Sequence, residues 1–315
     1  TCASIGVMMF GQRMAAITGD ASYYDYVEKA LYNTVIAGIN IAGDRYFYVN
    51  PLEVVPEFCT EHTYMEHVKP VRQKWFGVAC CPPNVGRTLA SLGQYIYAED
   101  EYGVYINQFI SSTADTEVRE SRLKIKMNST LLQDGKVQIE VQSSGPGNLN
   151  IRIPWYSEKC ECVQNGISIE IQPEKGYQRL SISPGDTYIS LDFHVSPRWM
   201  GANNGVRADA GKAALMKGPL VYCLEEKENG RYLSEIFIEE NTSIEETAPA
   251  EELVGNVPTL SYKGIRVRNK GAAGENQLYG NVELEKEEVS LQAVPYCMWN
   301  NRGEGEMLVW HKLRV

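Results

Sequence analysis

Hydrophobic residues in the first hundred positions recur with the period of an α-helix. Spacings of three and four residues run through three segments, residues 2–17, 22–36 and 85–96. The positions that form these stripes are Ile5, Met8, Met9, Gln12 and Ala16 in the first segment, Tyr24, Val27, Leu31 and Val35 in the second, and Val85, Leu89, Leu92 and Ile96 in the third. One such stripe on each segment predicts three amphipathic helices.

Start signals for helices accompany two of these segments. Ser22, followed three residues later by Asp25, resembles a capping box. Pro82 and Pro83 precede the third stripe, and proline is favoured in the first turn of a helix. Between the second and third helices, residues 40–79 have no hydrophobic period and predict a long irregular connection, which is often functional.

After about residue 100 the hydrophobic period becomes two. Apolar and polar residues alternate in short runs that begin at Leu123, Val137, Leu149 and Tyr188, and turn dipeptides such as Asp-Gly and Asn-Gly separate the runs. Short strands at this spacing predict a β-sandwich. A second strand-rich block starts near residue 205, whereas residues 225–252 are acidic, lack a period and predict a loop or insertion.

Composition narrows the class of protein. In 315 residues, 30 basic and 40 acidic side chains give a net charge of −10. A protein that binds nucleic acid or an anionic membrane needs a basic surface, so we expect neither partner. No run approaches the roughly 18 apolar residues of a membrane-spanning helix. With 43% hydrophobic and 22% charged residues, the chain has a globular composition and is long enough for two or three domains.

Eight cysteines are too few for a disulfide-rich scaffold of this length. We therefore expect reduced thiols in a reducing compartment, which favours a cytoplasmic location; a leader removed from upstream of Thr1 would not be visible in this sequence. Cys160 and Cys162 point to the same face of a predicted strand, and Cys223 and Cys297 lie in apolar runs. All four are expected to pack in the core.

Cys80 and Cys81 stand directly before the third predicted helix. The N-terminus of a helix favours anions such as thiolates, and two adjacent thiolates can both reach one metal ion. Tetrahedral zinc needs four ligands; Cys2, at the start of the first helix, could supply a third sulfur, and a histidine or a carboxylate the fourth. The alternative is that these cysteines are small buried hydrophobic residues, and the residues alone leave both interpretations open.

Other candidate residues have simpler explanations. His62 and His67 lie in the long connection, five residues apart, which is not the spacing of a helical ligand pair. Trp75 and the aromatic run at residues 46–48 could stack on sugar rings or fill a core. Glu28 is expected on the exposed face of its helix. The sequence has no Gly-x-Gly-x-x-Gly, P-loop, Gly-x-Ser-x-Gly or His-Glu-x-x-His motif, so nucleotide-binding, serine-hydrolase and zincin functions lose their usual support.

Several short motifs occur together in one order along the chain. They are Thr1-Cys2-Ala3-Ser4, Leu31-Tyr32-Asn33, Phe47-Tyr48-Val49-Asn50-Pro51-Leu52-Glu53, Cys80-Cys81-Pro82-Pro83-Asn84, Lys217-Gly218-Pro219-Leu220-Val221-Tyr222 and Trp299-Asn300-Asn301-Arg302-Gly303. With this set the chain resembles the β-L-arabinofuranosidase family, glycoside hydrolase family 127, along nearly its whole length. The resemblance is to the C-terminal half of the family's proteins.

This resemblance implies a multidomain α+β fold with three parts. Residues 1–98 would be the C-terminal helices of an (α/α)6 barrel. Residues 99–203 and 204–315 would be two antiparallel β-sandwich domains. The helical and strand periods found along the chain fall in the same order as these parts.

The resemblance also implies a set of site residues. Cys2, Cys80 and Cys81 match three ligands of the family's zinc ion, and Cys80 matches its catalytic nucleophile. Glu28 and Tyr48 match positions that line the sugar pocket. The fourth zinc ligand, a glutamate, and the acid/base glutamate would both lie upstream of the first residue. We therefore expect the chain to be a piece of a longer enzyme and to be inactive by itself.

The implied reaction is the retaining hydrolysis of non-reducing terminal β-L-arabinofuranosides in an oligosaccharide or glycoconjugate. Retaining glycosidases normally use a carboxylate nucleophile, and a zinc-bound thiolate of Cys80 would take its place. The chain could act with a complementing N-terminal fragment or as a homo-oligomer. The alternative function is a non-catalytic carbohydrate-binding or structural β module, with a structural metal or none, in which Cys80 does not react with a substrate.

Overall fold

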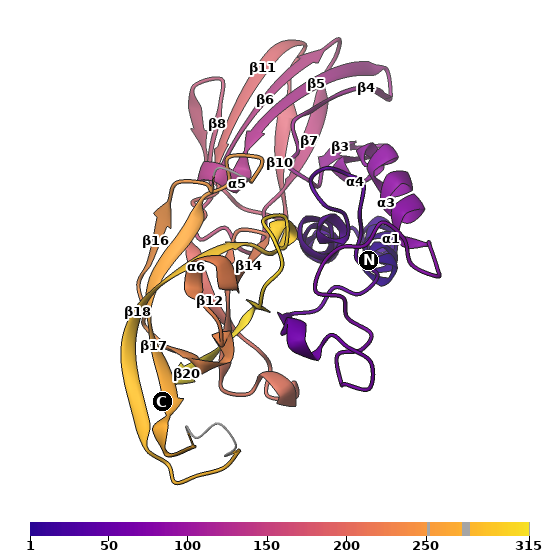
Figure 1. The fold of residues 1–315 in the computed structure, drawn as a ribbon. Helices are drawn as coiled ribbons and strands as arrows, with labels where there is room; N and C mark the ends of the chain where they lie inside the picture. Colours follow the sequence, from indigo (N-terminus) through magenta and orange to yellow (C-terminus); the bar gives the residue numbers. More distant parts are fainter. Residues whose placement is uncertain (251–252, 273–277, 315) are drawn as a thin grey trace. The chain divides into compact units, whose positions relative to one another are not determined.

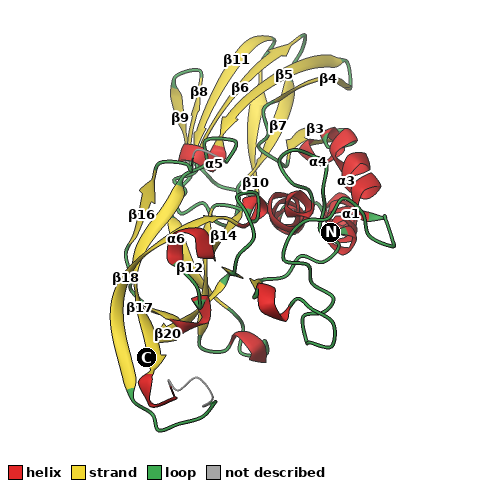
Figure 2. Ribbon diagram, in the orientation of Figure 1, coloured by secondary structure: helices red, strands yellow, loops and turns green. Residues whose placement is uncertain are grey.

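Two compact units make up the chain, each built from two separate stretches of sequence. The computed structural model describes residues 1–250, 253–272 and 278–314. The first unit comprises residues 1–36 and 79–196, and the second comprises residues 37–78 and 197–315. The longer helices belong to the first unit, and both units contain extended sheets (Figures 1 and 2). The fold is therefore a mixed α/β multidomain fold.

All three helices predicted from the sequence are present. They are α1 (Cys2–Thr18), α2 (Ser22–Ala30) and α3 (Cys81–Ala90), and a short α4 (Gly93–Ile96) continues the third stripe. Of the predicted stripe of α1, Ile5 and Met8 are buried, whereas Ala16 is exposed and Ala15 is buried in its place. At Gly11 the backbones of α1 and α2 approach so closely that a Cβ would lie 2.8 Å from a methyl of Val27. Glycine at this position therefore sets the distance between the two helices.

The second helix differs from its prediction in two ways. It widens into a π-helical turn at Leu31–Val35, where the Asn33 side chain donates a hydrogen bond to the carbonyl of Lys29 at 2.7 Å. That carbonyl is the normal α-helical acceptor for residue 33, so the side chain competes with the backbone for it. The predicted capping box is wrong, because no side chain caps this helix and Asp25 forms an ion pair with Arg152 instead.

Two sheets and one hydrophobic core form the β part of the first unit. Among its described residues, the six-stranded sheet has the order β4 (Ser112–Val118), β5 (Ser121–Thr130), β6 (Lys136–Ser143), β11 (Gly185–Asp192), β8 (Glu161–Gln164) and β9 (Ile167–Ile169). The four-stranded sheet has the order β10 (Tyr177–Ile182), β7 (Gly147–Arg152), β3 (Gly103–Ile106) and β2 (Tyr97–Asp100). Neighbours are antiparallel except for the parallel pair β3 and β7.

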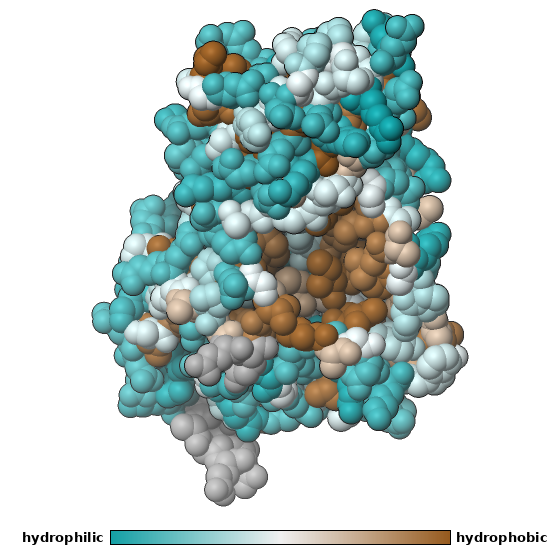
Figure 3. All heavy atoms as spheres, turned by 90° about the horizontal axis from the view of Figure 1, so that it is seen from above, coloured by the Kyte–Doolittle hydropathy of each residue, from teal (hydrophilic) through white to brown (hydrophobic). Residues whose placement is uncertain are grey.

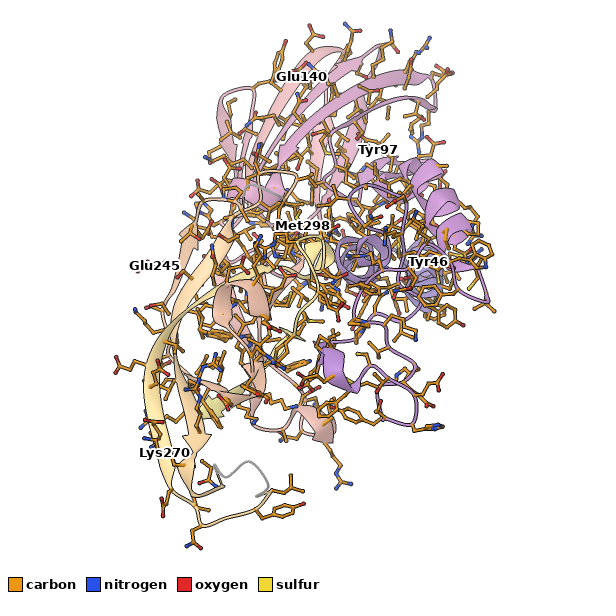
Figure 4. All side chains as sticks on the ribbon, viewed as in Figure 1. Tyr46, Tyr97, Glu140, Glu245, Lys270 and Met298 are labelled. Carbon is orange, nitrogen blue, oxygen red and sulfur yellow. The ribbon has the colours of Figure 1, made fainter. Side chains whose placement is uncertain are left out.

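The period of two in the sequence sets the two faces of the six-stranded sheet. On β5, Leu123 and Ile125 are buried in a core to which both sheets contribute, and the residues between them are exposed. On the exposed face, Glu140 of β6, which Figure 4 labels, pairs with Lys126 of β5 at 3.5 Å. A one-residue shift in pairing would exchange these two faces, so the pattern also fixes the register.

The second unit is built around one large, mostly antiparallel sheet. Within the described residues its strand order is β1 (Glu53–Val54), β19 (Met307–Leu308), β14 (Leu220–Glu225), β18 (Leu284–Pro295), β17 (Thr259–Asn269), β15 (Ile236–Glu239), β20 (Trp310–Arg314), β13 (Lys212–Lys217) and β12 (Pro197–Gly201), with β16 (Ile244–Thr247) paired to β17. The pair β15 and β20 is parallel. Strand β13 also pairs with β14, so the strands β13, β14, β18, β17, β15 and β20 close into a six-stranded barrel. The sandwich arrangement predicted for this block is therefore not confirmed.

Two expectations for irregular segments had different outcomes. Residues 40–79 are largely irregular, as predicted, and Tyr46 holds part of this stretch by donating a hydrogen bond from its hydroxyl to the carbonyl of Val78 at 3.0 Å (Figure 4). Residues 225–252 were expected to be a loop, and this is wrong for the part that the structure describes. A helix, α6 (Glu226–Asn229), and the strands β15 and β16 lie there, because pairing with β17 and β20 supplies the hydrogen bonds that the local pattern does not predict.

A buried arginine joins distant segments of the second unit. Arg72 lies 4.6 Å from the ring of Phe47, which stacks on Trp299 at 4.7 Å. Its guanidinium donates hydrogen bonds to the carbonyls of Ala37, at 2.9 and 3.2 Å, and of Trp299, at 2.8 Å. Burial lowers the pKa of Arg72 to about 10, so the group is charged at neutral pH. One side chain thus connects the irregular segment to the C-terminal motif.

The surface is consistent with the composition. Figure 3 shows hydrophilic residues around the outside of one face and a broad hydrophobic area in its middle. Within the described ranges, no helix has the length and apolar character needed to span a membrane.

We expect Arg72→Ala to reduce the free energy of unfolding by about 3 kcal/mol, because it removes a cation–π contact and the buried hydrogen bonds that the guanidinium donates to the carbonyls of Ala37 and Trp299. Urea denaturation of the whole chain measures this value. Arg45→Ala is the matched control, since Arg45 is exposed and forms an exposed ion pair with Asp44, and it should change the value by less than about 0.5 kcal/mol. Equal effects of the two variants would contradict the connecting role of Arg72.

Candidate active site

Three cysteine sulfurs converge where two helices of the first unit begin. Cys2 is the first residue of α1, Cys81 is the first residue of α3, and Cys80 is the N-cap of α3. The Sγ atoms of Cys2 and Cys81 are 3.9 Å apart, and those of Cys80 and Cys81 are 4.0 Å apart. All three lie within 4.8 Å of one another and form the single group of candidate metal ligands found among the described residues. We call these residues the cysteine cluster.

The cysteine cluster has the dimensions of a zinc site. A Zn–S distance of about 2.3 Å in a tetrahedron places two sulfur ligands about 3.8 Å apart. The distances of 3.9 and 4.0 Å are close to this value without any rearrangement of the backbone. Thiolates are soft ligands that suit zinc, so the donor type agrees with the spacing. The three residues can therefore hold zinc and leave one of its four positions for another ligand.

Asn84 belongs to this site, although sequence analysis assigns it no role. Its Nδ2 donates a hydrogen bond to Sγ of Cys2 at 3.1 Å, and its Oδ1 accepts one from Arg87 at 3.0 Å. Asn84 lies one helical turn after Cys80, which brings its side chain to the same end of α3. This four-residue spacing from Cys80 is the feature of the sequence that could have indicated a role for Asn84. A donor held in this way orients and stabilises a thiolate, as hydrogen bonds from outside the ligand set do in metal sites.

Within the cysteine cluster, the pKa values of Cys2 and Cys81 shift in opposite directions. Burial alone would raise the pKa of Cys2, but hydrogen bonds from Asn84 and the neighbouring cysteines outweigh it and lower the pKa. Burial and the nearby Cys2 sulfur raise the pKa of Cys81 to about 12. Cys2 therefore ionises more readily than Cys81, and ionising a second sulfur beside it requires a cation to offset the repulsion.

Accessibility separates Cys80 from the other cysteines. All eight cysteines lie in described ranges, none is in a disulfide, and Cys80 alone is exposed. Cys162, Cys223 and Cys297 are buried and Cys160 is partly buried, so the core-packing prediction for these four is confirmed. Burial raises the pKa of Cys160 to about 12 and that of Cys162 to about 11, as expected for packed thiols. Within the cluster, Cys80 is the sulfur that an incoming molecule can reach.

Glu28 has a different environment from the one predicted. Instead of lying on an exposed helix face, it is fully buried, so that expectation is wrong. Its Oε1 is 2.6 Å from Nη2 of Arg152 and accepts a hydrogen bond from the Tyr156 hydroxyl at 3.2 Å. Arg152 also pairs with Asp25 at 2.5 Å. We call these four residues the Arg152 cluster.

The Arg152 cluster ties α2 to strand β7. Arg152 is fully buried, and its Nε donates a further hydrogen bond to the carbonyl of Asn107 at 2.7 Å. Burial raises the pKa of Asp25 and Glu28, and the charge of Arg152 opposes this rise. A buried cation with two carboxylates is strongly destabilised if one member is removed. Contact between Glu28 and a sugar stays a prediction.

Tyr48 and the two candidate histidines lie in the second unit. Tyr48 is 44% exposed and its ring packs against that of Phe76 at 6.0 Å, so it can present an aromatic face to a ligand. Its place in a sugar pocket stays a prediction. His62 and His67 are exposed and belong to no group of candidate metal ligands in the described residues.

Comparison with domain families covers nearly the whole chain. Residues 1–94 match the catalytic domain of glycoside hydrolase family 127 β-L-arabinofuranosidases, residues 103–193 match the middle domain of that family, and residues 197–312 match its C-terminal domain. The chain belongs to glycoside hydrolase family 127.

Individual members of family 127 agree with this assignment. A non-reducing end β-L-arabinofuranosidase of Bifidobacterium longum is 35% identical over 99% of the chain and 48% of its own length. A GH127 β-L-arabinofuranosidase from Geobacillus stearothermophilus T6 is 37% identical, with a TM-score of 0.92 over 99% of the chain and 49% of its own. A further GH127 β-arabinofuranosidase structure is 27% identical, with a TM-score of 0.87 over the same 99% and 49%. The chain thus spans about half the length of these relatives.

We expect zinc to bind the chain more tightly as pH rises from about 6 to 8, by up to about tenfold per pH unit for each proton that binding releases. The reason is that the pKa of Cys81, at about 12, keeps its thiol protonated until the metal displaces the proton. Competition titrations with a chromophoric chelator at several pH values measure the affinity. Cys81→Ala should weaken binding strongly, and Cys160→Ala, outside the cluster, should not. A pH-independent affinity would contradict thiolate ligation.

Proposed function

We propose that the protein containing this chain is a retaining glycoside hydrolase that removes non-reducing terminal β-L-arabinofuranosyl groups. Cys2, Cys80 and Cys81 would hold a zinc ion, and Cys80 would be the nucleophile. The single observation that carries the proposal is the convergence of the three sulfurs at a spacing that suits zinc, with the accessible one at the N-terminus of α3. The names of the relatives supply the substrate class.

The same proposal extends to the domain organisation. Residues 1–98 would complete an (α/α)6 catalytic barrel, and residues 99–203 and 204–315 would be two β-sandwich domains. The matches to the catalytic, middle and C-terminal domains of family 127 support this division. The common core of the two sheets in the first unit supports the first sandwich.

The residues of the chain suit the nucleophilic half of the reaction. When bound, zinc would keep its sulfur ligands ionised at neutral pH and make a thiolate a better leaving group. Cys80 would attack the anomeric carbon, its sulfur forming the new bond while the bond to the leaving oxygen breaks and that oxygen takes the electron pair. Asn84 would hold the Cys2 sulfur in place through its hydrogen bond. Protonation of the leaving group needs an acid/base residue, which the family resemblance assigns to a glutamate outside this chain.

A second candidate function is a carbohydrate-binding β module. The observation that favours it is a shallow groove of about 670 Å³ on the polar face of the six-stranded sheet. Tyr188, which is 59% exposed, and the Lys126–Glu140 pair line this groove. Such a module binds sugars without a reactive cysteine, so the chemistry of Cys80 separates the two functions.

A substrate whose leaving group needs no protonation tests the proposal on this chain. Without an acid/base residue the chain should not turn over ordinary arabinosides. We still expect the zinc-loaded chain to react once with 2,4-dinitrophenyl β-L-arabinofuranoside, releasing dinitrophenolate and gaining one pentosyl group on Cys80. Intact-protein and peptide mass spectrometry locate the adduct. The pentosyl group should be absent from Cys80→Ala and present on Cys160→Ala, which keeps the cluster intact.

Two outcomes would contradict the proposed nucleophile. One is a folded, zinc-loaded chain that gains no pentosyl group. The other is an equal gain on Cys80→Ala, which would assign the reaction to another residue. In both cases binding of arabinosides without reaction would favour the carbohydrate-binding function.

A further inference from the structure

A cavity of about 300 Å³ lies in the first unit, away from the cysteine cluster. The C-terminal half of α1, helix α2 and strands β2, β3 and β10 surround it. The lining residues used below are Gln12, Ala16, Tyr24, Tyr105, Asn107 and Tyr177. This volume is at the lower end of the range for small-molecule sites.

The cavity and the cysteine cluster are separate places on α1. Gln12 and Ala16 follow Cys2 by ten and fourteen residues, which is about 15 to 21 Å along a helix axis. They also lie on the side of the helix opposite to Val7 and Phe10, which are exposed. A molecule in the cavity therefore does not contact the cysteine sulfurs.

The cavity wall contains a rigid hydrogen-bond donor without a partner. Asn107 is fully buried, and its backbone is fixed at both ends, by the carbonyl of Ile96 at 2.8 Å and by Arg152 at 2.7 Å. Its Oδ1 accepts a hydrogen bond from the Tyr177 hydroxyl at 2.6 Å, which orients the amide. The Nδ2 atom has no partner among the described residues. Buried amide donors are almost always paired, so an unpaired one in a cavity wall suggests a missing acceptor.

Tyrosines supply the rest of the wall. The rings of Tyr105 and Tyr177 meet edge to face at 5.0 Å. Tyr24 adds a buried ring whose hydroxyl makes no hydrogen bond within the described residues, and burial raises its pKa to about 12, which keeps it protonated at neutral pH. Tyrosine combines an apolar face with a polar tip, a combination that suits ligands with both apolar faces and hydroxyl groups.

Charged groups of the cavity are confined to its rim. Arg13, Glu99 and Asp100 line it but are exposed. Glu99 accepts a hydrogen bond from Thr116, and Asp100 accepts bonds from Tyr105 and from backbone amides. An ionic ligand would need an opposite charge deeper inside, and the described wall offers neutral groups there. The chemistry thus favours a neutral, polyhydroxylated ligand.

We propose that this cavity is a second saccharide site, non-catalytic, that binds one neutral sugar ring. Hydroxyl oxygens of the ring would accept from Asn107 and exchange hydrogen bonds with Tyr24, while its carbon face would pack on the tyrosine rings. The cavity itself indicates a neutral polyol; the choice of a pentose as the probe rests on the proposed function.

Titration of the zinc-loaded chain with L-arabinose, followed by saturation-transfer difference NMR and calorimetry, tests the site. We expect a dissociation constant in about the millimolar range. Ala16→Trp, which fills the cavity from an exposed position of α1, should weaken binding by about tenfold or more. Val7→Trp, the control on the opposite side of the same helix, should leave it unchanged. Tyr24→Phe removes one hydroxyl, keeps the ring and should weaken binding about fivefold.

The outcomes separate this site from the proposed active site. Binding that is lost in Cys80→Ala but kept in Ala16→Trp would overturn the cavity site and leave the glycosidase proposal standing. Binding that depends on Ala16 and Tyr24 in a chain that forms no Cys80 adduct would support the cavity and count against the glycosidase. Absence of binding at about 50 mM arabinose to the folded chain would overturn the cavity site. If Ala16→Trp does not fold, judged by circular dichroism, Tyr24→Phe decides.

Discussion

The site depends on bringing two helix N-termini together. Helices α1 and α3 both begin at a cysteine of the cluster, and neither start is capped by a side-chain hydrogen bond. Each N-terminus carries unpaired N–H groups and about half a positive charge, so two of them in proximity favour negative charge between them. Thiolates supply that charge, and a divalent cation then allows more than one thiol to ionise. The ionisation of the cysteine sulfurs therefore depends on the position of the two helix N-termini as well as on the cation.

The remainder of the first unit fixes this helix arrangement. Gly11 allows α1 to approach α2 closely, and the Arg152 cluster attaches α2 to strand β7. Because Arg152 also holds the backbone of Asn107, the same buried charge organises the helices and the wall of the second cavity. The fully buried Glu28 thus has a structural role, because it helps to attach α2 to β7 through Arg152.

Sequence reasoning reached the elements that have a strong local signal. The stripes of α1, α2 and α3 and the period of two in β5 predicted these elements, because part of each pattern is buried against the core. The match is incomplete, since Ala16 and Leu89 of the predicted stripes are exposed. The strands β15 and β16 were missed, since partners far along the chain stabilise them. Asp25 was assigned to a helix cap because its spacing from Ser22 is a local signal. Its true partner, Arg152, is 127 residues away along the chain and gives no local signal. The roles of Asn84 and Asn107 were missed for the same reason: each depends on a partner, or the lack of one, that only the folded chain reveals.

The central claim is that Cys2, Cys80 and Cys81 together bind one zinc ion. X-ray absorption spectroscopy at the zinc edge, on the chain loaded with one equivalent of zinc, tests it most directly. The account predicts three sulfur neighbours at about 2.3 Å and one lighter neighbour, with one sulfur lost in Cys81→Ala. A first shell made only of nitrogen and oxygen, or a spectrum unchanged in Cys81→Ala, would contradict it.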